Sequence, residues 1–264
     1  MAHTVLNDLF DPEVVGNDIE KKLIDAVKFA PLCNVDSTLV GGPGDELTMP
    51  SYAYTGAANN VLEGGTIGID NITQSTSKVK VHKIAKAIGY TDEALLMGSG
   101  NSIAEEASKQ IILSMADKIE SEILTQMATA TLTGTVTQGS EVAGMAAALG
   151  QFGEDIDGDK VVVMPISVYT TLLQAGFIQG TELGANTILR GSLGRFMGCD
   201  IIISNRLSAL MYIVKPGAMR LVMKRGTLVE FDRDILTETN VIKASKIYAP
   251  YLYDATKIIK VTAY

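Results

Sequence analysis

The amino-acid sequence predicts an α+β fold, in which helices and strands are mixed without a repeating unit. Three observations support this prediction. A long helical pattern covers residues 102–131, two alternating segments before it are typical of a two-stranded ribbon, and short strand and helix patterns follow from about residue 139. The chain has 264 residues, of which 47% are hydrophobic, so it can bury a sizeable core in one large domain or two intertwined ones.

The pattern of residues 1 to about 40 predicts an N-terminal arm that carries one short amphipathic helix. The helix begins near Asp18 and is ended by Pro31. Its apolar side is formed by Ile19, Leu23, Ile24 and Val27. A sharp Gly-Gly-Pro-Gly-Asp turn at residues 41–45 separates this arm from the next element.

The next segment predicts a long two-stranded ribbon from Leu47 to Ile84. Residues 46–50 and 76–87 alternate as strands do, and the glycine-rich stretch between them would form the tip. Because an isolated ribbon is barely stable in water, we expect it to pack against another subunit.

A single long helix is predicted over residues 102–131, after a short helix capped by Thr91. Ser102 and Glu105 have the spacing of a capping box, and no Gly or Pro occurs before Gly134. Such a helix is about 40 Å long. It is either an ordinary core helix or a spine laid across a sheet. Apolar residues recur at every fourth position: Ile103, Ala107, Ile111, Met115, Ile119, Ile123 and Met127.

The second half of the chain predicts short helices and strands. Helices are expected at residues 143–152 and 167–176, followed by a loop at 177–190. Strands are expected at residues 160–164, 199–204, 211–215, 219–223, 228–231, 241–248 and 257–262.

Composition limits the possible functions. The net charge of −8 disfavours binding to nucleic acid or anionic membranes. No apolar run approaches the ~20 residues of a membrane span, and the N-terminus lacks the features of a signal peptide. Two cysteines and two histidines are too few for a disulfide scaffold or a typical zinc site, which predicts a reduced protein without a metal or cofactor.

Five features resemble functional motifs but depart from them. The Gly98–Ser102 segment lacks the lysine of a phosphate loop, the Asp155–Lys160 segment breaks the calcium-loop pattern, and Arg190 replaces the first glycine of a nucleophile elbow. The Phe231–Ile235 segment favours an ion-pair network at a strand end, and His82 favours a surface position on a strand. The sequence therefore predicts no catalytic site and no enzyme.

Seven segments stand out by their order and spacing: residues 11–14, 29–39, 42–50, 63–64, 88–96, 198–205 and 231–235. Together they resemble the tailed-bacteriophage major capsid proteins of the Hong Kong 97 fold. The similarity is greatest to the branch named after the coat protein of phage N4.

The resemblance implies four structural parts. They are an N-terminal arm (1–44), an extended β-ribbon loop (45–86), a peripheral domain (87–139 and 223–253) that holds the spine helix 102–131, and an axial domain (140–222 and 254–264).

The resemblance also implies that the chain is a structural subunit of a virion. Copies would form hexamers and pentamers of an icosahedral shell, assembled in the bacterial host cytoplasm, that encloses double-stranded DNA without sequence-specific binding. A portal and a decoration protein are implied partners. This sequence shows no long helical extension before the arm, so a separate scaffolding protein is expected.

The ribbon is expected to contact neighbouring subunits without a covalent bond. Residues 29–77 contain neither Lys nor Arg, so the ribbon lacks the lysine that cross-links the type member of the fold. Its candidate contact residues are Tyr52, Tyr54, Val61, Leu62, Ile67 and Ile69. Two alternative functions remain open: an encapsulin-type nanocompartment shell of the same fold, and an acidic α+β hydrolase.

Overall fold

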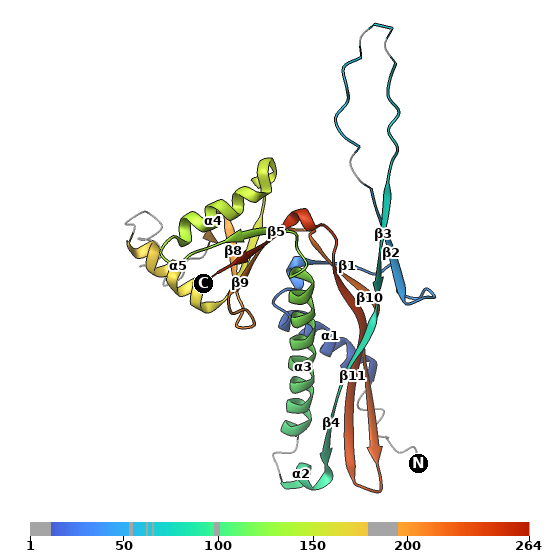
Figure 1. Cartoon of the computed structure of the whole chain (residues 1–264). Helices are drawn as coiled ribbons and strands as arrows, with labels where there is room; N and C mark the ends of the chain where they lie inside the picture. The colour runs from blue at the N-terminus through green and yellow to red at the C-terminus, as the bar shows by residue number, and fades with distance from the viewer. Residues whose placement is uncertain are drawn as a thin grey trace.

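The structure is a computed structural model that describes residues 12–52, 55–61, 63–64, 66–97, 101–178 and 195–263. It contains a four-stranded sheet beside one long helix, a six-stranded sheet carrying shorter helices, and a two-stranded ribbon that projects well beyond both (Figure 1). Across the described residues, every helix is too short or too polar to span a lipid bilayer.

The four-stranded sheet has the order β1-β10-β11-β4. Its strands are β1 (Cys33–Asp36), β4 (His82–Thr91), β10 (Met219–Asp234) and β11 (Thr239–Leu252). β11 lies antiparallel between β10 and β4, and β1 pairs in parallel with β10. The predicted strands 219–223 and 228–231 are one strand, β10, whose register shifts around Arg225. The prediction of two strands was wrong because a bulge can interrupt the pairing pattern without ending a strand.

The spine helix α3 (Asn101–Met127) packs against β11 and β4 of this sheet, and Figure 1 shows it lying along the strands. Ile111, Ile119 and Met127 of its apolar stripe are at most 3% exposed. The spine interpretation is therefore confirmed, whereas the predicted end at residue 131 is wrong. The chain turns after Met127 and extends at Leu132 to pair with another strand. The predicted cap of this helix involves Ser102, whose side chain lies outside the described ones.

The arm helix α1 (Pro12–Ala26) packs on β10 and α3. Leu23 and Val27 are buried as predicted, but Ile24 is 53% exposed, so its assignment to the buried side was wrong. Ile24 follows Leu23 by one position and therefore points about 100° away from it around the helix. A short 3-10 helix, η2 (Ala30–Leu32), connects α1 to β1.

The six-stranded sheet has the order β5-β12-β9-β6-β8-β7. Its strands are β5 (Leu132–Thr135), β6 (Lys160–Met164), β7 (Arg195–Phe196), β8 (Cys199–Ile203), β9 (Leu210–Val214) and β12 (Ile258–Thr262). The helices α4 (Glu141–Leu149), η3 (Gly150–Ile156) and α5 (Ile166–Ile178) belong to this half, and η4 (Ala255–Lys257) precedes β12. Strand β5 was not predicted. Most of the predicted loop 177–190 lies outside the described residues.

The ribbon consists of β2 (Glu46–Tyr52) and β3 (Gln74–Lys80), paired from Glu46↔Lys80 to Tyr52↔Gln74. The single strand predicted over 76–87 is in fact divided at Val81 between β3 and β4. Val81 is buried and donates its backbone N–H to Asp45 O at 2.9 Å, while the next residues pair with β11. The ribbon therefore ends at Lys80 and does not reach Ile84.

Candidate assembly surface

The outer part of the ribbon exposes apolar side chains to water. The described residues between β2 and β3 form neither helix nor strand, and each one with a described side chain is exposed. The exposed fractions are 47% for Val61, 74% for Ile67, 93% for Ile69 and 73% for Ile72. Exposed apolar groups gathered on one projecting segment are typical of a protein–protein contact.

Three of the six predicted contact residues can be placed by their side chains. Val61, Ile67 and Ile69 are all exposed on the segment between β2 and β3. Tyr52 is the last residue of β2, but its side chain lies outside the described ones. Tyr54 and Leu62 both lie outside the described residues. Ile72 was missed, although an apolar residue in a glycine-rich polar segment was a usable signal.

The base of the ribbon is fixed to the body of the subunit. Nζ of Lys224 donates to the carbonyl oxygens of Gly42 and Gly44 in the turn that precedes β2, and the second distance is 3.0 Å. Gly44 has a φ of +94°, which an L side chain rarely adopts. A small hydrophobic core that includes Val81 and Tyr251 packs at the base of the ribbon. The ribbon thus projects from a fixed base.

A hollow of about 460 Å³ lies between β3, α3 and the end of β11. On its wall, Nε2 of His82 lies 3.0 Å from Glu122 Oε2, and Lys118 Nζ lies 3.2 Å from Glu122 Oε1. The histidine is on a strand and half-exposed, as predicted. The contact between His82 and Glu122 joins β4 to α3 along the wall of this hollow.

A second exposed apolar cluster lies at the far end of the four-stranded sheet. Leu96 and Met97, on α2 (Asp92–Met97), are 85% and 91% exposed, and Ile235 and Leu236, in the turn between β10 and β11, are 82% and 95% exposed. Figure 1 shows α2 beside this turn, at the opposite end of the subunit from the ribbon tip. This cluster was not predicted from the sequence. Two adjacent apolar residues at the end of a short helix, and two in a turn, were the available signals.

Ion pairs at this end support the predicted interpretation of the Phe231–Ile235 segment. Arg233 Nη2 lies 2.5 Å from Asp92 Oδ2, and Asn240 Nδ2 donates to Asp92 Oδ1 at 2.5 Å. In addition, the backbone N–H of Ala94 donates to Thr91 Oγ1 at 3.3 Å, which is the predicted cap of α2. These contacts join α2 to the β10–β11 turn.

The acidic turn that resembles a calcium loop contains the ammonium group of Lys160. Its Nζ donates to Ile156 O at 2.6 Å and to Gly158 O at 2.9 Å. Among the described residues, no group of three His, Cys, Asp or Glu side chains is placed to hold a metal ion. Burial raises the pKa of Cys33 to about 12, which keeps that thiol protonated and unreactive.

Comparisons with known proteins agree with one another. The family described as "Phage capsid protein" matches residues 74–261. The major capsid protein of Staphylococcus phage phiMR11 is 34% identical over 255 residues, which cover 95% of this chain and 92% of that protein.

Solved structures with the same fold include two from phages and one from an archaeal virus-like particle. The capsid of cyanophage P-SCSP1u has a TM-score of 0.74 at 13% identity, covering 90% of this chain and 88% of that one. Mycobacterium phage Che8 has a TM-score of 0.70 at 17% identity, covering 89% and 90%. A virus-like particle from Pyrococcus furiosus has a TM-score of 0.61 at 10% identity, covering 93% and 98%.

Proposed function

Because this chain belongs to the phage capsid protein family, we infer that it is the major capsid protein of a phage and that copies of it build the shell. The Hong Kong 97 fold predicted from the sequence is confirmed by the similarity of the whole subunit to solved phage capsids. The role is structural, so we expect no enzymatic activity.

One observation carries the assembly proposal: Ile67, Ile69 and Ile72 are at least 73% exposed on a segment that projects away from its own subunit. Covering a fully exposed isoleucine side chain contributes about 2 kcal/mol. A neighbouring copy is the partner that a shell of identical subunits supplies. The exposed cluster of Leu96, Met97, Ile235 and Leu236 supplies a second contact at the other end.

The two sheets support a division into two domains. We assign α3 and the strands β4, β10 and β11 to the peripheral domain, to whose sheet the arm adds β1, and we assign the six-stranded sheet to the axial domain. Because Leu132–Thr135 pair with β12, we place the end of the first peripheral segment near residue 131 instead of residue 139. Residues 1–44 would be the arm, and residues 45–81 the extended loop.

Several finer features of assembly follow from the family. We propose that the copies form hexamers and pentamers of an icosahedral shell, which encloses double-stranded DNA without reading its sequence. The net charge of −8 supports this, because an acidic surface does not bind DNA tightly. A separate scaffolding protein, a portal and a decoration protein would complete the virion, which would assemble in the cytoplasm of the bacterial host.

The alternative is a protein nanocompartment of the encapsulin type. The virus-like particle from Pyrococcus furiosus supports this alternative at the level of the fold. The phage assignment is favoured, since the 34% identity over 95% of the chain is to a phage protein. Nucleic acid inside particles from infected cells would favour the phage shell, and an enzyme cargo would favour the nanocompartment.

The experiment is to express the chain and examine it by sedimentation velocity and negative-stain electron microscopy. Rings or shells are expected. A matched variant without residues 56–70 should remain folded but stop assembling, because the deletion removes exposed residues and leaves the anchored base intact. A compact monomer of the full chain over a wide range of concentration and salt would contradict the proposal.

A further inference from the structure

The polypeptide crosses between the two sheets at three places that lie at one end of α3. The crossings are residues 128–131, 215–218 and 253–257. The second and third crossings are hydrogen-bonded to each other, since Lys215 N–H donates to Lys257 O at 3.0 Å and Tyr253 N–H donates to Ala218 O at 2.9 Å. Covalent links gathered in one place form a hinge about which one sheet can tilt against the other.

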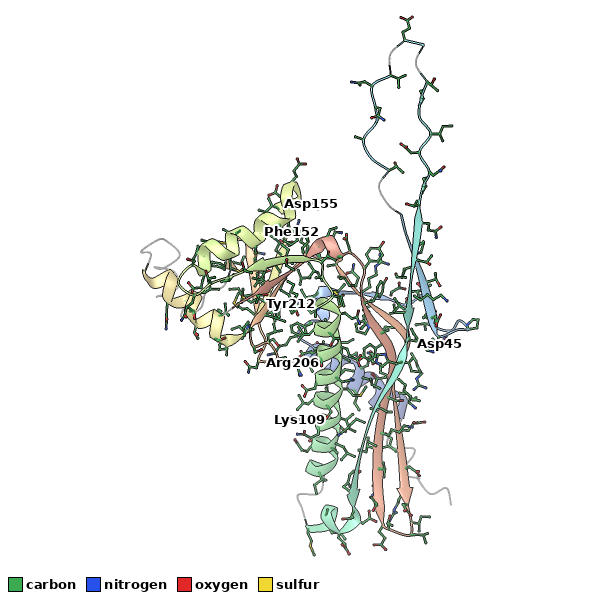
Figure 2. All side chains as sticks on the ribbon, in the orientation of Figure 1. Asp45, Lys109, Phe152, Asp155, Arg206 and Tyr212 are labelled. Atoms are coloured by element: carbon green, nitrogen blue, oxygen red, sulfur yellow. The ribbon has the colours of Figure 1, made fainter. Side chains whose placement is uncertain are left out.

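A fourth link lies away from this hinge. Arg206, in the turn between β8 and β9, donates from Nε to Glu120 Oε2 at 3.0 Å and from Nη2 to Asp117 Oδ1. Both carboxylates belong to α3, and Figure 2 labels Arg206 beside that helix. Ala128, at the first crossing, lies eight positions after Glu120, which is about 12 Å along a helix.

Both ends of this link are held firmly. Glu120 has a side chain that is only 9% exposed, and it also accepts the backbone N–H of Lys28 at 2.8 Å. On the other side, the turn that carries Arg206 is attached to the six-stranded sheet at both ends. Ser204 N–H donates to Met164 O at 3.0 Å, and Ala263 N–H donates to Ala209 O at 2.7 Å.

Apolar packing near the hinge does not replace this link. Tyr212 and Val214 of the six-stranded sheet share a core with Ile123 and Met127 of α3. Apolar burial depends on area and has little directionality, whereas the planar guanidinium of an arginine binds carboxylates in a fixed geometry. The ion pair therefore adds a directional contact between the two sheets to the apolar core that they share.

We propose that Arg206 and Glu120, with Asp117, form a strut that sets the angle between the two sheets and thereby the curvature of the shell. This inference rests on the proposed function. In a closed shell the same subunit geometry is repeated in every copy, so a change of angle adds up around the particle. The strut makes Arg206 a positioning residue for assembly.

The test is the variant Arg206→Gln, compared with Arg195→Gln as a matched control. Arg195 pairs with Asp200 at 2.6 Å within one sheet, so the control loses an arginine ion pair that does not join the two sheets. Particle diameters are measured by cryo-electron microscopy, and folding of the subunits by circular dichroism. We expect Arg206→Gln to lose the single-diameter population, while the control retains it. Shells of Arg206→Gln with the diameter distribution of the wild type would overturn the proposal.

A second variant covers the case in which Arg206→Gln fails to fold. Asp117 has a side chain that is 71% exposed, so Asp117→Asn removes one arm of the strut without disturbing the core. We expect this variant to broaden the diameters without lowering the folded fraction, and an unchanged distribution would overturn the proposal. If the wild-type chain formed neither rings nor shells, the proposed function would fail, whereas normal shells from the variants would refute the strut alone.

Discussion

The hydroxyl of Tyr248 donates a 2.7 Å hydrogen bond to Oε2 of Glu122, although the two residues lie 126 positions apart in the sequence. The same carboxylate lies 3.0 Å from His82 Nε2 and 3.2 Å from Lys118 Nζ. Burial and the bond to Glu122 raise the pKa of Tyr248, so its hydroxyl stays protonated and can donate. One side chain of α3 therefore holds β4 and β11 together at the base of the ribbon.

Replacing Tyr248 by Phe should lower the free energy of unfolding by about 1.5–3 kcal/mol, because it removes a buried hydrogen bond to a charged acceptor. Urea unfolding followed by circular dichroism measures the change. Tyr253→Phe is the control, since Tyr253 is half-exposed and contacts Arg220 through its ring, which Phe retains. Equal stabilities of the two variants would show that the Tyr248 bond contributes nothing.

Replacing Ile119 or Ile111 by Asp should prevent folding. Both side chains are at most 3% exposed beneath the four-stranded sheet, and an unpaired buried charge costs about 3–5 kcal/mol. Leu113→Asp is the control on the same helix, because Leu113 is 47% exposed. Soluble expression and a thermal melt separate the outcomes. A cooperative melt of Ile119→Asp near the wild-type temperature would mean that this stripe is not a core.

Replacing Gly134 by Ala should destabilise the six-stranded sheet. A Cβ atom at position 134 would lie 2.9 Å from the Cβ of Ala148 on α4, closer than two such atoms normally approach. Overpacking of this kind costs about 1–3 kcal/mol. In the control Gly150→Ala, the new Cβ meets no atom within 4 Å and the φ of −60° suits alanine. Thermal unfolding should therefore shift for the first variant alone.

The stability of the arm helix on the sheet should depend on Glu20 in acid. Burial alone would raise the pKa of Glu20, but hydrogen bonds from Lys246 and Thr227 outweigh burial and lower the pKa below its ordinary value of 4.5. A carboxylate with a lowered pKa contributes stability that is fully present above pH 4.5 and is lost as the pH falls through the folded-state value.

The variant Glu20→Gln should therefore be less stable than the wild type near neutral pH, and its stability should fall less between about pH 5 and pH 3. Chemical unfolding at a series of pH values measures both effects. Glu63→Gln, on the exposed ribbon, is the control and should follow the wild type. Parallel curves for Glu20→Gln and the wild type would refute the coupling.

Mature particles should dissociate fully in hot denaturant. Residues 29–77 hold no amine side chain that could form an isopeptide bond at the ribbon tip. A denaturing gel should show a single band near the chain mass of 28.1 kDa. A ladder of resistant multimers would contradict a non-covalent ribbon contact.

The long helix and most strands could be predicted because their signals are local. Apolar residues at every fourth position predicted α3, and the apolar run Lys160–Met164 predicted a buried strand. Strand β5 could not be predicted in this way. It has four residues, and it forms only by pairing in parallel with β12, more than 100 residues later.

Local signals also predicted part of the candidate contact surface. Ile67 and Ile69 stood out as apolar residues in a polar, glycine-rich segment. In contrast, the cluster at the opposite end joins α2 to a turn that is distant in the sequence, and the Arg206–Glu120 contact spans 86 positions. Neither residue of that pair carries a local signal, since charged side chains on a helix or in a turn are usually solvated.

The continuity of β3 with β4 has a mechanical consequence. The two strands run nearly in line through Val81 (Figure 1), and β4 is paired with β11 along its whole length, from His82↔Tyr248 to Thr91↔Thr239. A pull on the ribbon therefore acts along β4 and across its hydrogen bonds, which share the tension in shear and must rupture together. A load on the proposed contact between the ribbon and a neighbouring copy would therefore be carried within the subunit by the whole β4–β11 ladder.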